Sequence, residues 1–231
     1  MPNPKSSPAN NKLLAKATLR SRIKNHIQQQ IASGVYRPGD RIIETQLARE
    51  LNVSQSPVRE ALLELSISGL LEEVPYSGTY VRQLSAADII DIYDSRAYIE
   101  KYAAERAATR ITDAQLQELG DILVAMSSCS EHEYDDYCKL DIHFHSIIFD
   151  AAGSPSLKRL WTNVRMSEWT NLCVRVTQDP MANLIEPHRA IYEHLCNHDA
   201  ACAGAYALLH IRTYGEKLSK YFLQEYDAPS L

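Results

Sequence analysis

Residues 45–62, which read TQLARELNVSQSPVREAL, restrict the possible folds of this chain more than any other segment. The first part places Leu47, Ala48 and Leu51 on one face of a short helix, and the small Ala48 allows another helix to cross closely. Asn52 follows where a tight turn needs a residue that tolerates a positive φ angle. The segment therefore predicts two helices joined by a tight turn.

The second helix of this pair has a polar leading end. Its start is predicted from Ser54 to Pro57, because a hydroxyl can cap a helix and proline is tolerated in the first turn. Gln55, Ser56 and Arg59 then point outward near the N-terminus. This arrangement is typical of a helix-turn-helix, whose second helix meets base edges and phosphates. An ordinary helical hairpin would share part of the pattern.

A β-hairpin is predicted directly after these helices. Leu71–Val74 and Thr79–Arg82 have strand-like composition and flank a Pro-Tyr-Ser-Gly turn at residues 75–78. A recognition helix followed by a hairpin is the order of a winged helix, whose tip can reach a minor groove. A plain helix-hairpin scaffold is the alternative. We expect Tyr76 and Tyr80 to pack within the wing rather than stack on bases.

Charge is unevenly distributed over the 231 residues. The formal net charge is −5. Residues 1–82 carry 11 basic against 7 acidic side chains (+4), whereas residues 83–231 carry 13 against 22 (−9). An acidic chain with a basic first third suits local contact with a polyanion better than nonspecific coating of one.

The composition argues against secretion and membrane insertion. The five cysteines show neither CxxC spacing nor an even count, which favours reduced thiols. The first residues are polar and proline-rich without the apolar stretch of a signal peptide, and no apolar run approaches membrane-spanning length. We expect a soluble cytoplasmic protein without a membrane partner.

The second half is predicted to be helical throughout. Ser85–Asp88 and Thr112–Gln115 match capping boxes, and six or seven helices are expected to form an antiparallel bundle. The fold class is therefore mainly α, a winged helix-turn-helix followed by an all-helical bundle. The expected divisions are a disordered tail 1–12, a first domain 13–82 with its first helix at about Leu13–Ser33, a linker 83–84, a bundle 85–223 and a tail 224–231.

Four polar residues at apolar helix positions indicate a metal site in the bundle. Asp141 and His145 are four residues apart, so they share one face of a helix. His188 and His210 are each flanked by apolar positions, where a polar side chain must find a partner. A solvated or hydrogen-bonded structural set is the alternative. Neutral imidazole and carboxylate donors suit Zn²⁺, with Ni²⁺ or Mn²⁺ as other choices, and disfavour Ca²⁺ and Cu(I).

The chain resembles the GntR family of bacterial transcription regulators, in its FadR-like branch with the all-helical FCD ligand domain. The resemblance covers about residues 14–222. It rests on a Gly-x-Tyr-x-Pro-Gly-Asp-Arg motif at 34–41, on the helix-turn-helix segment, on Asp94-x-Arg-x-x-Ile-Glu100, and on the spacing of the four metal-site residues. It implies a homodimer on a palindromic operator. The family's DNA-contacting positions fall on Thr45, Ser54, Gln55, Ser56, Arg59, Ser77 and Gly78.

The resemblance also implies a sensor for small molecules. Family effectors are often small carboxylates bound at or beside the metal ion, and Arg96 is a candidate partner for such a group. A salt bridge from Arg96 to Glu100 is the alternative. We expect a DNA-binding repressor controlled by a small organic acid, and not an enzyme. The competing hypotheses are a metal-dependent enzyme with a DNA-binding head, and a DNA-binding protein whose metal is purely structural.

Overall fold

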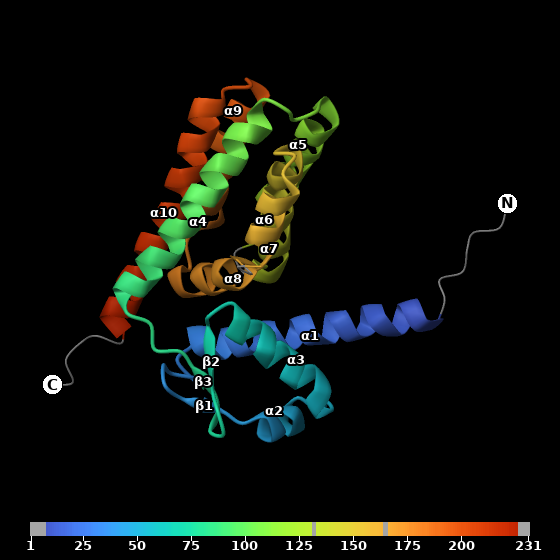
Figure 1. Ribbon diagram of the computed structural model, residues 1–231, viewed down its shortest axis with the longest axis vertical. Helices are drawn as coiled ribbons and strands as arrows, with labels where there is room; N and C mark the ends of the chain where they lie inside the picture. Colours follow the sequence, from blue (N-terminus) through green and yellow to red (C-terminus); the bar gives the residue numbers. More distant parts are fainter. Residues whose placement is uncertain (1–7, 131–132, 164–165, 226–231) are drawn as a thin grey trace. The chain divides into compact units, whose positions relative to one another are not determined.

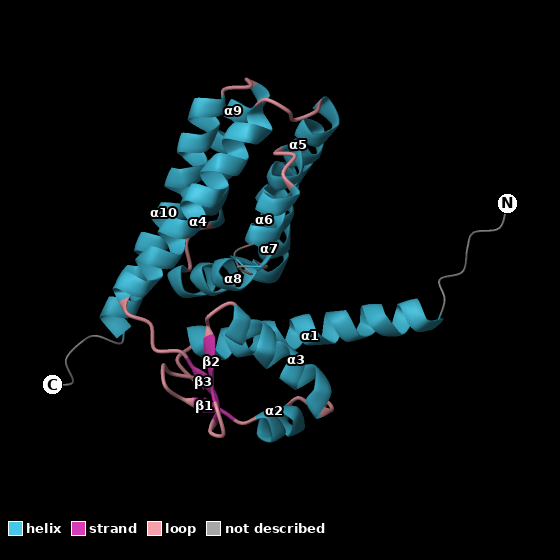
Figure 2. Ribbon diagram, in the orientation of Figure 1, coloured by secondary structure: helices cyan, strands magenta, loops and turns pink. Residues whose placement is uncertain are grey.

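The computed structural model describes residues 8–130, 133–163 and 166–225. The chain divides into two compact units, Met1–Gln83 and Leu84–Leu231 (Figure 1). All strands among the described residues belong to the first unit, and the second is built from helices (Figure 2). No helix in the described ranges is both long and apolar enough to cross a membrane.

The first unit combines three helices with a small antiparallel sheet. The strand order is β1-β3-β2, and Tyr80 at the centre of β3 lies opposite Arg41 on one side and Glu72 on the other. Its elements are α1 (Pro8–Ala32), β1 (Arg41–Ile42), α2 (Glu44–Glu50), α3 (Gln55–Ile67), β2 (Leu71–Val74) and β3 (Gly78–Val81). The winged helix-turn-helix order predicted from the sequence is confirmed.

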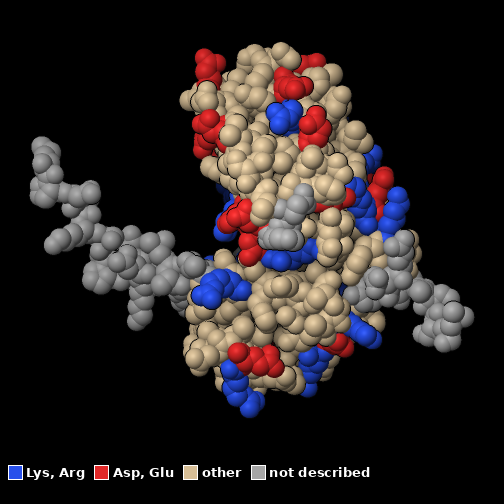
Figure 3. All heavy atoms as spheres, turned by 180° about the vertical axis from the view of Figure 1, so that it is seen from behind, with Lys and Arg blue, Asp and Glu red and all other residues tan. Residues whose placement is uncertain are grey.

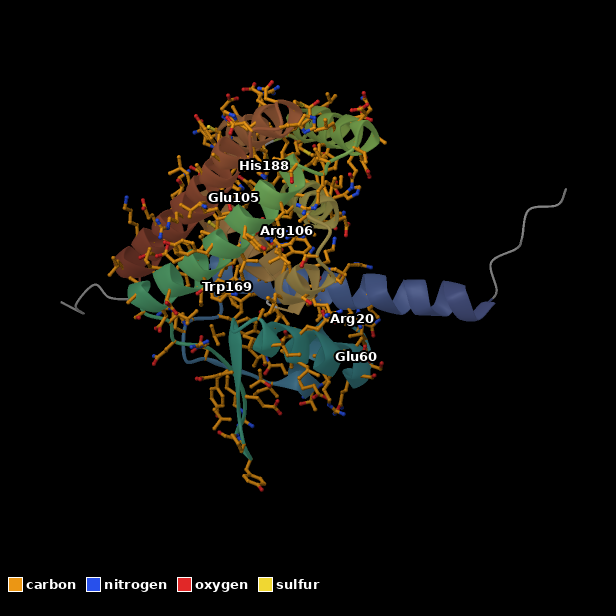
Figure 4. All side chains as sticks on the ribbon, turned by 45° about the horizontal axis from the view of Figure 1, so that its top comes forward. Arg20, Glu60, Glu105, Arg106, Trp169 and His188 are labelled. Carbon is orange, nitrogen blue, oxygen red and sulfur yellow. The ribbon has the colours of Figure 1, made fainter. Side chains whose placement is uncertain are left out.

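Helix α1 shares a hydrophobic core with the helix-turn-helix. Its buried face repeats every four residues at Ile23, Ile27 and Ile31, and it packs against α3. Arg20 extends from α1 toward Glu60 of α3, with 3.5 Å between Nη1 and Oε2 (Figure 4). The helix begins within the segment expected to be a disordered tail, because proline is well suited to the first helical position.

The turn between α2 and α3 has the geometry that the sequence predicts. Asn52 adopts a φ angle of +53°, and its backbone N–H donates to the carbonyl of Arg49 at 3.1 Å. The N–H of Val53 donates to the carbonyl of Ala48 at 3.0 Å. These bonds close α2 so that α3 can begin after the N-cap residue Ser54.

The second unit is a helical bundle with α4 and α10 packed closely along each other. Both predicted capping boxes are present, at Ser85 with Asp88 and at Thr112 with Gln115. Gly215 of α10 permits this close packing, because a Cβ there would lie 2.5 Å from the Cβ of Tyr93. The helices are α4 (Ala86–Ala108), α5 (Asp113–Ser127), α6 (Tyr134–Ala151), α7 (Pro155–Asn163), α8 (Met166–Thr177), α9 (Met181–Cys196) and α10 (Ala200–Glu225).

Candidate metal centre and DNA-contacting surface

Four side chains from three helices meet inside the bundle. Asp141 and His145 come from α6, His188 from α9 and His210 from α10. Each offers one ligand atom, and these atoms all lie within 4.8 Å of one another. All four residues are buried, and Figure 4 shows His188 in the interior of the helical unit. The structure thus brings together the four residues that the sequence indicated.

The contact between His188 and Asp141 requires a positive species. The Nδ1–H of His188 donates to the carbonyl of Leu184 at 2.8 Å, which directs Nε2 toward Asp141 Oδ1 at 3.0 Å. In a neutral imidazole that second nitrogen carries a lone pair, which the carboxylate oxygen repels. Either a proton or a metal cation between the two atoms removes this repulsion.

His145 is oriented by a buried carboxylate on α4. Its Nδ1–H donates to Glu100 Oε2 at 2.9 Å, so that Nε2 faces the cluster and lies 3.9 Å from Asp141 Oδ1. A carboxylate behind a ligating histidine is a recurrent arrangement at metal sites, where it fixes the ring and raises its basicity. The sequence pairs Glu100 with Arg96 alone and does not reveal this contact, since Glu100 and His145 are far apart in the chain.

Two buried nitrogens of the cluster lack hydrogen-bond partners among the described residues. They are His145 Nε2 and His210 Nδ1. An unpaired buried polar atom costs free energy, and a shared cation would satisfy such atoms together. Three imidazoles and one carboxylate suit a divalent transition metal. The residues present therefore fit the ion that the sequence suggested.

Electrostatics favours the metal-binding form of two of the four residues, Asp141 and His210. Burial lowers the pKa of His210 well below its ordinary value, and the neighbouring His188 and His145 lower it further. Burial raises the pKa of Asp141, but the hydrogen bond from His188 and the charge of His145 outweigh it, so the pKa falls. His145 differs: burial lowers its pKa, but Glu100 outweighs burial and raises it. A metal ion at His145 would compete with the proton whose binding Glu100 favours.

A small cavity adjoins this cluster. Asp141 and His210 form part of its wall, together with Arg96, Thr170 and Tyr214. Arg96 Nε donates to Glu100 Oε1 at 3.2 Å, and its Nη1 donates to Thr170 Oγ1 at 3.1 Å. The salt bridge considered for Arg96 is thus present, and the same side chain also lines the cavity. Tyr214 could have been found from the sequence, because it lies one turn after His210.

The residues proposed to contact DNA lie on the surface of the first unit. Thr45 of α2 and Ser54, Gln55, Ser56 and Arg59 around the start of α3 are all exposed, while Ser77 and Gly78 in the hairpin are half-buried. Lys and Arg side chains are spread over the surface of this unit beside a few acidic ones (Figure 3).

Arg59 is held in a two-point ion pair. Its Nη2 and Nε donate to the Glu44 carboxylate at 2.8 and 3.0 Å. The hydrogen bond and charge of Glu44 raise the pKa of Arg59. A phosphate or base would have to compete with Glu44 for this guanidinium. The sequence did not reveal the pair, because its members are fifteen residues apart on different helices.

The hairpin tip differs in part from expectation. Tyr80 packs within the hairpin as predicted, with its hydroxyl 2.5 Å from Ser77 Oγ. Tyr76 was predicted to pack as well, and this is wrong: it is fully exposed. The physical reason is its φ angle of +62° at the turn, which directs the side chain away from the strands.

Comparison with known proteins identifies both units. The model of the gntR family of bacterial regulatory proteins matches residues 19–81, and the FCD domain model matches residues 91–213. The chain belongs to the GntR family and carries an FCD domain. The fold class and the family resemblance inferred from the sequence are confirmed.

Relatives of this GntR-family chain are transcription regulators. The HTH-type transcriptional regulator LutR of Bacillus subtilis (strain 168) is 31% identical over 83% of this chain and 97% of its own length. The gluconate operon transcriptional repressor of the same organism is 30% identical over 71% and 69%. The solved structure of E. coli McbR/YncC shares the fold, with a TM-score of 0.62 at 22% identity over 89% and 98%. The chain is a transcriptional regulator and not an enzyme.

Proposed function

We propose that this GntR-family regulator is a repressor whose operator binding is controlled by a small organic acid bound beside a metal ion in the FCD domain. The observation that carries the proposal is the convergence of four buried ligand side chains next to a cavity lined by Arg96. Zn²⁺ suits this donor set, and Ni²⁺ or Mn²⁺ would fit the same residues.

DNA recognition is assigned to the exposed end of α3, the start of α2 and the hairpin. Two copies of the chain would place their recognition helices about one DNA turn apart on a palindromic site. Gln55 can pair in a bidentate manner with adenine, whereas Arg59 suits guanine or a phosphate. The residues proposed for this contact are Thr45, Ser54, Gln55, Ser56, Arg59, Ser77 and Gly78.

Effector recognition is assigned to the cavity beside the four ligands. Arg96 is buried, and its guanidinium carries five N–H groups, two of which make the bonds to Glu100 and Thr170. Further donors can hold a carboxylate, and Tyr214 places an aromatic hydroxyl on the same wall. A metal ion, when bound, would supply Lewis-acidic positions for the oxygens of the same ligand. The cavity measures about 10 Å³, which is room for about one water molecule. We therefore expect a small acid bearing oxygens at two points, and its entry must move the lining side chains apart.

Control of DNA binding requires that the acid binds one arrangement of the protein better than another. Arg96 lies one turn before Glu100, and Glu100 orients His145, so a ligand on Arg96 acts on the helix that supports the cluster. Helix α4 begins almost directly after the first unit ends, at a joint that we place at residues 83–84. A joint of this length can pass a shift of α4 to the DNA-binding unit.

The metal assignment is tested by elemental analysis of the purified full chain. We expect His188→Ala to lose the bound metal and His143→Ala to retain it. The control is matched, because His143 is an exposed histidine of the same bundle that pairs with Glu118 at 3.2 Å. An unchanged metal content in His188→Ala would overturn the ligand assignment.

The sensor assignment is tested by a thermal-shift screen of small organic acids on metal-loaded protein, followed by DNA retardation. A supporting result is an acid that raises the melting temperature, releases the operator, and does neither in Arg96→Met. If chelation lowers the melting temperature while no acid changes DNA binding, the metal is purely structural and the sensor proposal is wrong.

A further inference from the structure

The corner between α9 and α10 carries a second group of metal-binding side chains. His194, Asp199 and Cys202 each present one ligand atom, and these atoms all lie within 4.8 Å of one another. His194 Nδ1 is 4.0 Å from Asp199 Oδ2. In tetrahedral zinc sites with bonds of about 2.0–2.3 Å, neighbouring ligand atoms are roughly 3.3–3.8 Å apart. Small side-chain rotations would bring these three atoms to that spacing.

Contacts that involve no metal already hold the side chains of Asp199 and His194 in place. Asp199 precedes α10, and its Oδ1 accepts from the N–H of Cys202 at 3.0 Å, which leaves Oδ2 on the side of His194. The imidazole of His194 stacks on Tyr206, with ring centroids 4.7 Å apart and an interplanar angle of 29°. The three residues are partly exposed, so an ion can reach them from solvent.

The Cys202 thiol lies within 4.8 Å of a carboxylate oxygen of Asp199. The hydrogen bond from the Cys202 thiol to Asp199 raises the pKa of that thiol. A divalent cation would replace the proton of the thiol, because thiolate is the form of cysteine that binds metals. The exchange releases one proton to solvent for each ion bound and needs no oxidant or reductant.

We propose that His194, Asp199 and Cys202 form a second, solvent-accessible site for a divalent transition metal in this protein, separate from the buried cluster. One imidazole, one carboxylate and one thiolate are ligands that Zn²⁺ accepts, and three protein ligands leave a fourth position for water. The buried cluster has a different donor set of three imidazoles and one carboxylate.

The place of this site in the fold gives it a structural consequence. It links the end of α9 to the start of α10, and these helices supply His188 and His210 to the buried cluster. His198, in the loop between them, has a φ angle of +53° and bonds through Nδ1 to the carbonyl of Ala108 at 2.8 Å. An ion at the corner would restrain the connection between α9 and α10, and these two helices position the buried ligands His188 and His210.

Cobalt spectroscopy of the full chain distinguishes the two sites. Co²⁺ bound by thiolate gives a charge-transfer band in the near ultraviolet, which a site of imidazoles and carboxylate does not give. We expect this band in the wild type and in His188→Ala, and its loss in Cys202→Ser. Cys196→Ser should keep it, which separates the site from the exposed thiol of Cys196.

Asp199→Asn provides a test that preserves the fold. Asparagine caps a helix as well as aspartate does, so α10 should still begin normally. We expect apparent Co²⁺ affinity at the corner to fall roughly tenfold or more, with unchanged far-ultraviolet circular dichroism. The proposal is overturned if the wild type shows no thiolate band, if the band persists in Cys202→Ser, or if Asp199→Asn binds Co²⁺ as tightly as the wild type.

Discussion

At the scale of single residues, Arg59 is the side chain whose removal tests the DNA-contacting surface most directly. It is exposed on α3, and its guanidinium donates two hydrogen bonds to the carboxylate of Glu44. We expect Arg59→Ala to weaken operator binding on the order of tenfold to a hundredfold at constant salt. Fluorescence anisotropy with labelled operator measures this change. Arg189→Ala, which removes an exposed arginine from α9, should bind as the wild type does.

Glu44 should have the opposite effect on DNA binding. Its carboxylate occupies the donors of Arg59 and adds a negative charge where phosphates would approach. We expect Glu44→Gln to bind DNA roughly a few-fold more tightly, and to gain more on nonspecific DNA than on the operator, since phosphate contacts carry no sequence information. Weaker binding to both DNAs would mean that Glu44 positions Arg59 for recognition instead of masking it.

Glu100 is predicted to act on metal binding through His145. The carboxylate accepts from His145, Arg96 and Trp161, and it touches none of the other three cluster residues in the contacts described. We expect Glu100→Gln to lower metal affinity roughly 10- to 100-fold, as for other carboxylates that orient a ligating histidine. Titration against a competing chelator measures the affinity. The control is Glu105→Gln, because Glu105 is a half-exposed carboxylate on the same helix (Figure 4).

At the scale of elements, the contact between α4 and α10 should respond unequally to two glycine substitutions. A Cβ at Gly215 would lie 2.5 Å from the Cβ of buried Tyr93. That atom is bonded directly to the backbone, so a change of side-chain rotamer cannot move it away. A Cβ at Gly204 would lie 2.5 Å from Cγ of Glu105, a flexible side chain that can turn away. We expect Gly215→Ala to destabilise the protein by about 1–3 kcal/mol and Gly204→Ala by clearly less. Equal melting temperatures would show that α4 and α10 can move apart freely.

Elements with local signals were predictable from the sequence. Asn52 marked the turn of the helix-turn-helix, and Ser85 and Thr112 marked helix starts, because capping and turn chemistry involve neighbours within four residues. The limits of the helices were harder to predict: the first helix was expected from about Leu13, and α1 begins at Pro8. A helix can extend into a polar segment when no strong stop signal precedes it.

Contacts between distant segments were not predictable in the same way. Asp141 and His145 could be paired from their four-residue spacing, and His188 and His210 could be added because each is a polar residue flanked by apolar helix positions. Glu100 behind His145, and Glu44 beside Arg59, depend on how helices pack, which periodicity does not specify. The corner formed by His194, Asp199 and Cys202 was missed for the same reason, since its geometry depends on the turn between two helices.

At the scale of the whole molecule, His210 and His145 should contribute opposite pH dependences to the free energy of unfolding of the metal-free protein on the two sides of pH 6.5. Burial lowers the pKa of His210 from its ordinary 6.5, so the unfolded chain takes up a proton there first. Its contribution to stability is complete above pH 6.5 and is lost as the pH falls. The pKa of His145 is raised, because Glu100 outweighs burial. Its contribution is complete below pH 6.5 and is lost as the pH rises through the folded-state value.

Variants of the two histidines separate these opposite slopes. Urea unfolding of chelator-treated protein between about pH 5 and pH 8 gives the free energy of unfolding at each pH. We expect His210→Gln to reduce the fall in the free energy of unfolding below pH 6.5. His145→Gln should reduce the fall in the free energy of unfolding above pH 6.5. Metal-loaded wild type should decline less above pH 6.5, because its ligands have already released their protons. Identical slopes in the wild type and both variants would show that neither imidazole titrates differently in the folded bundle and in the unfolded chain.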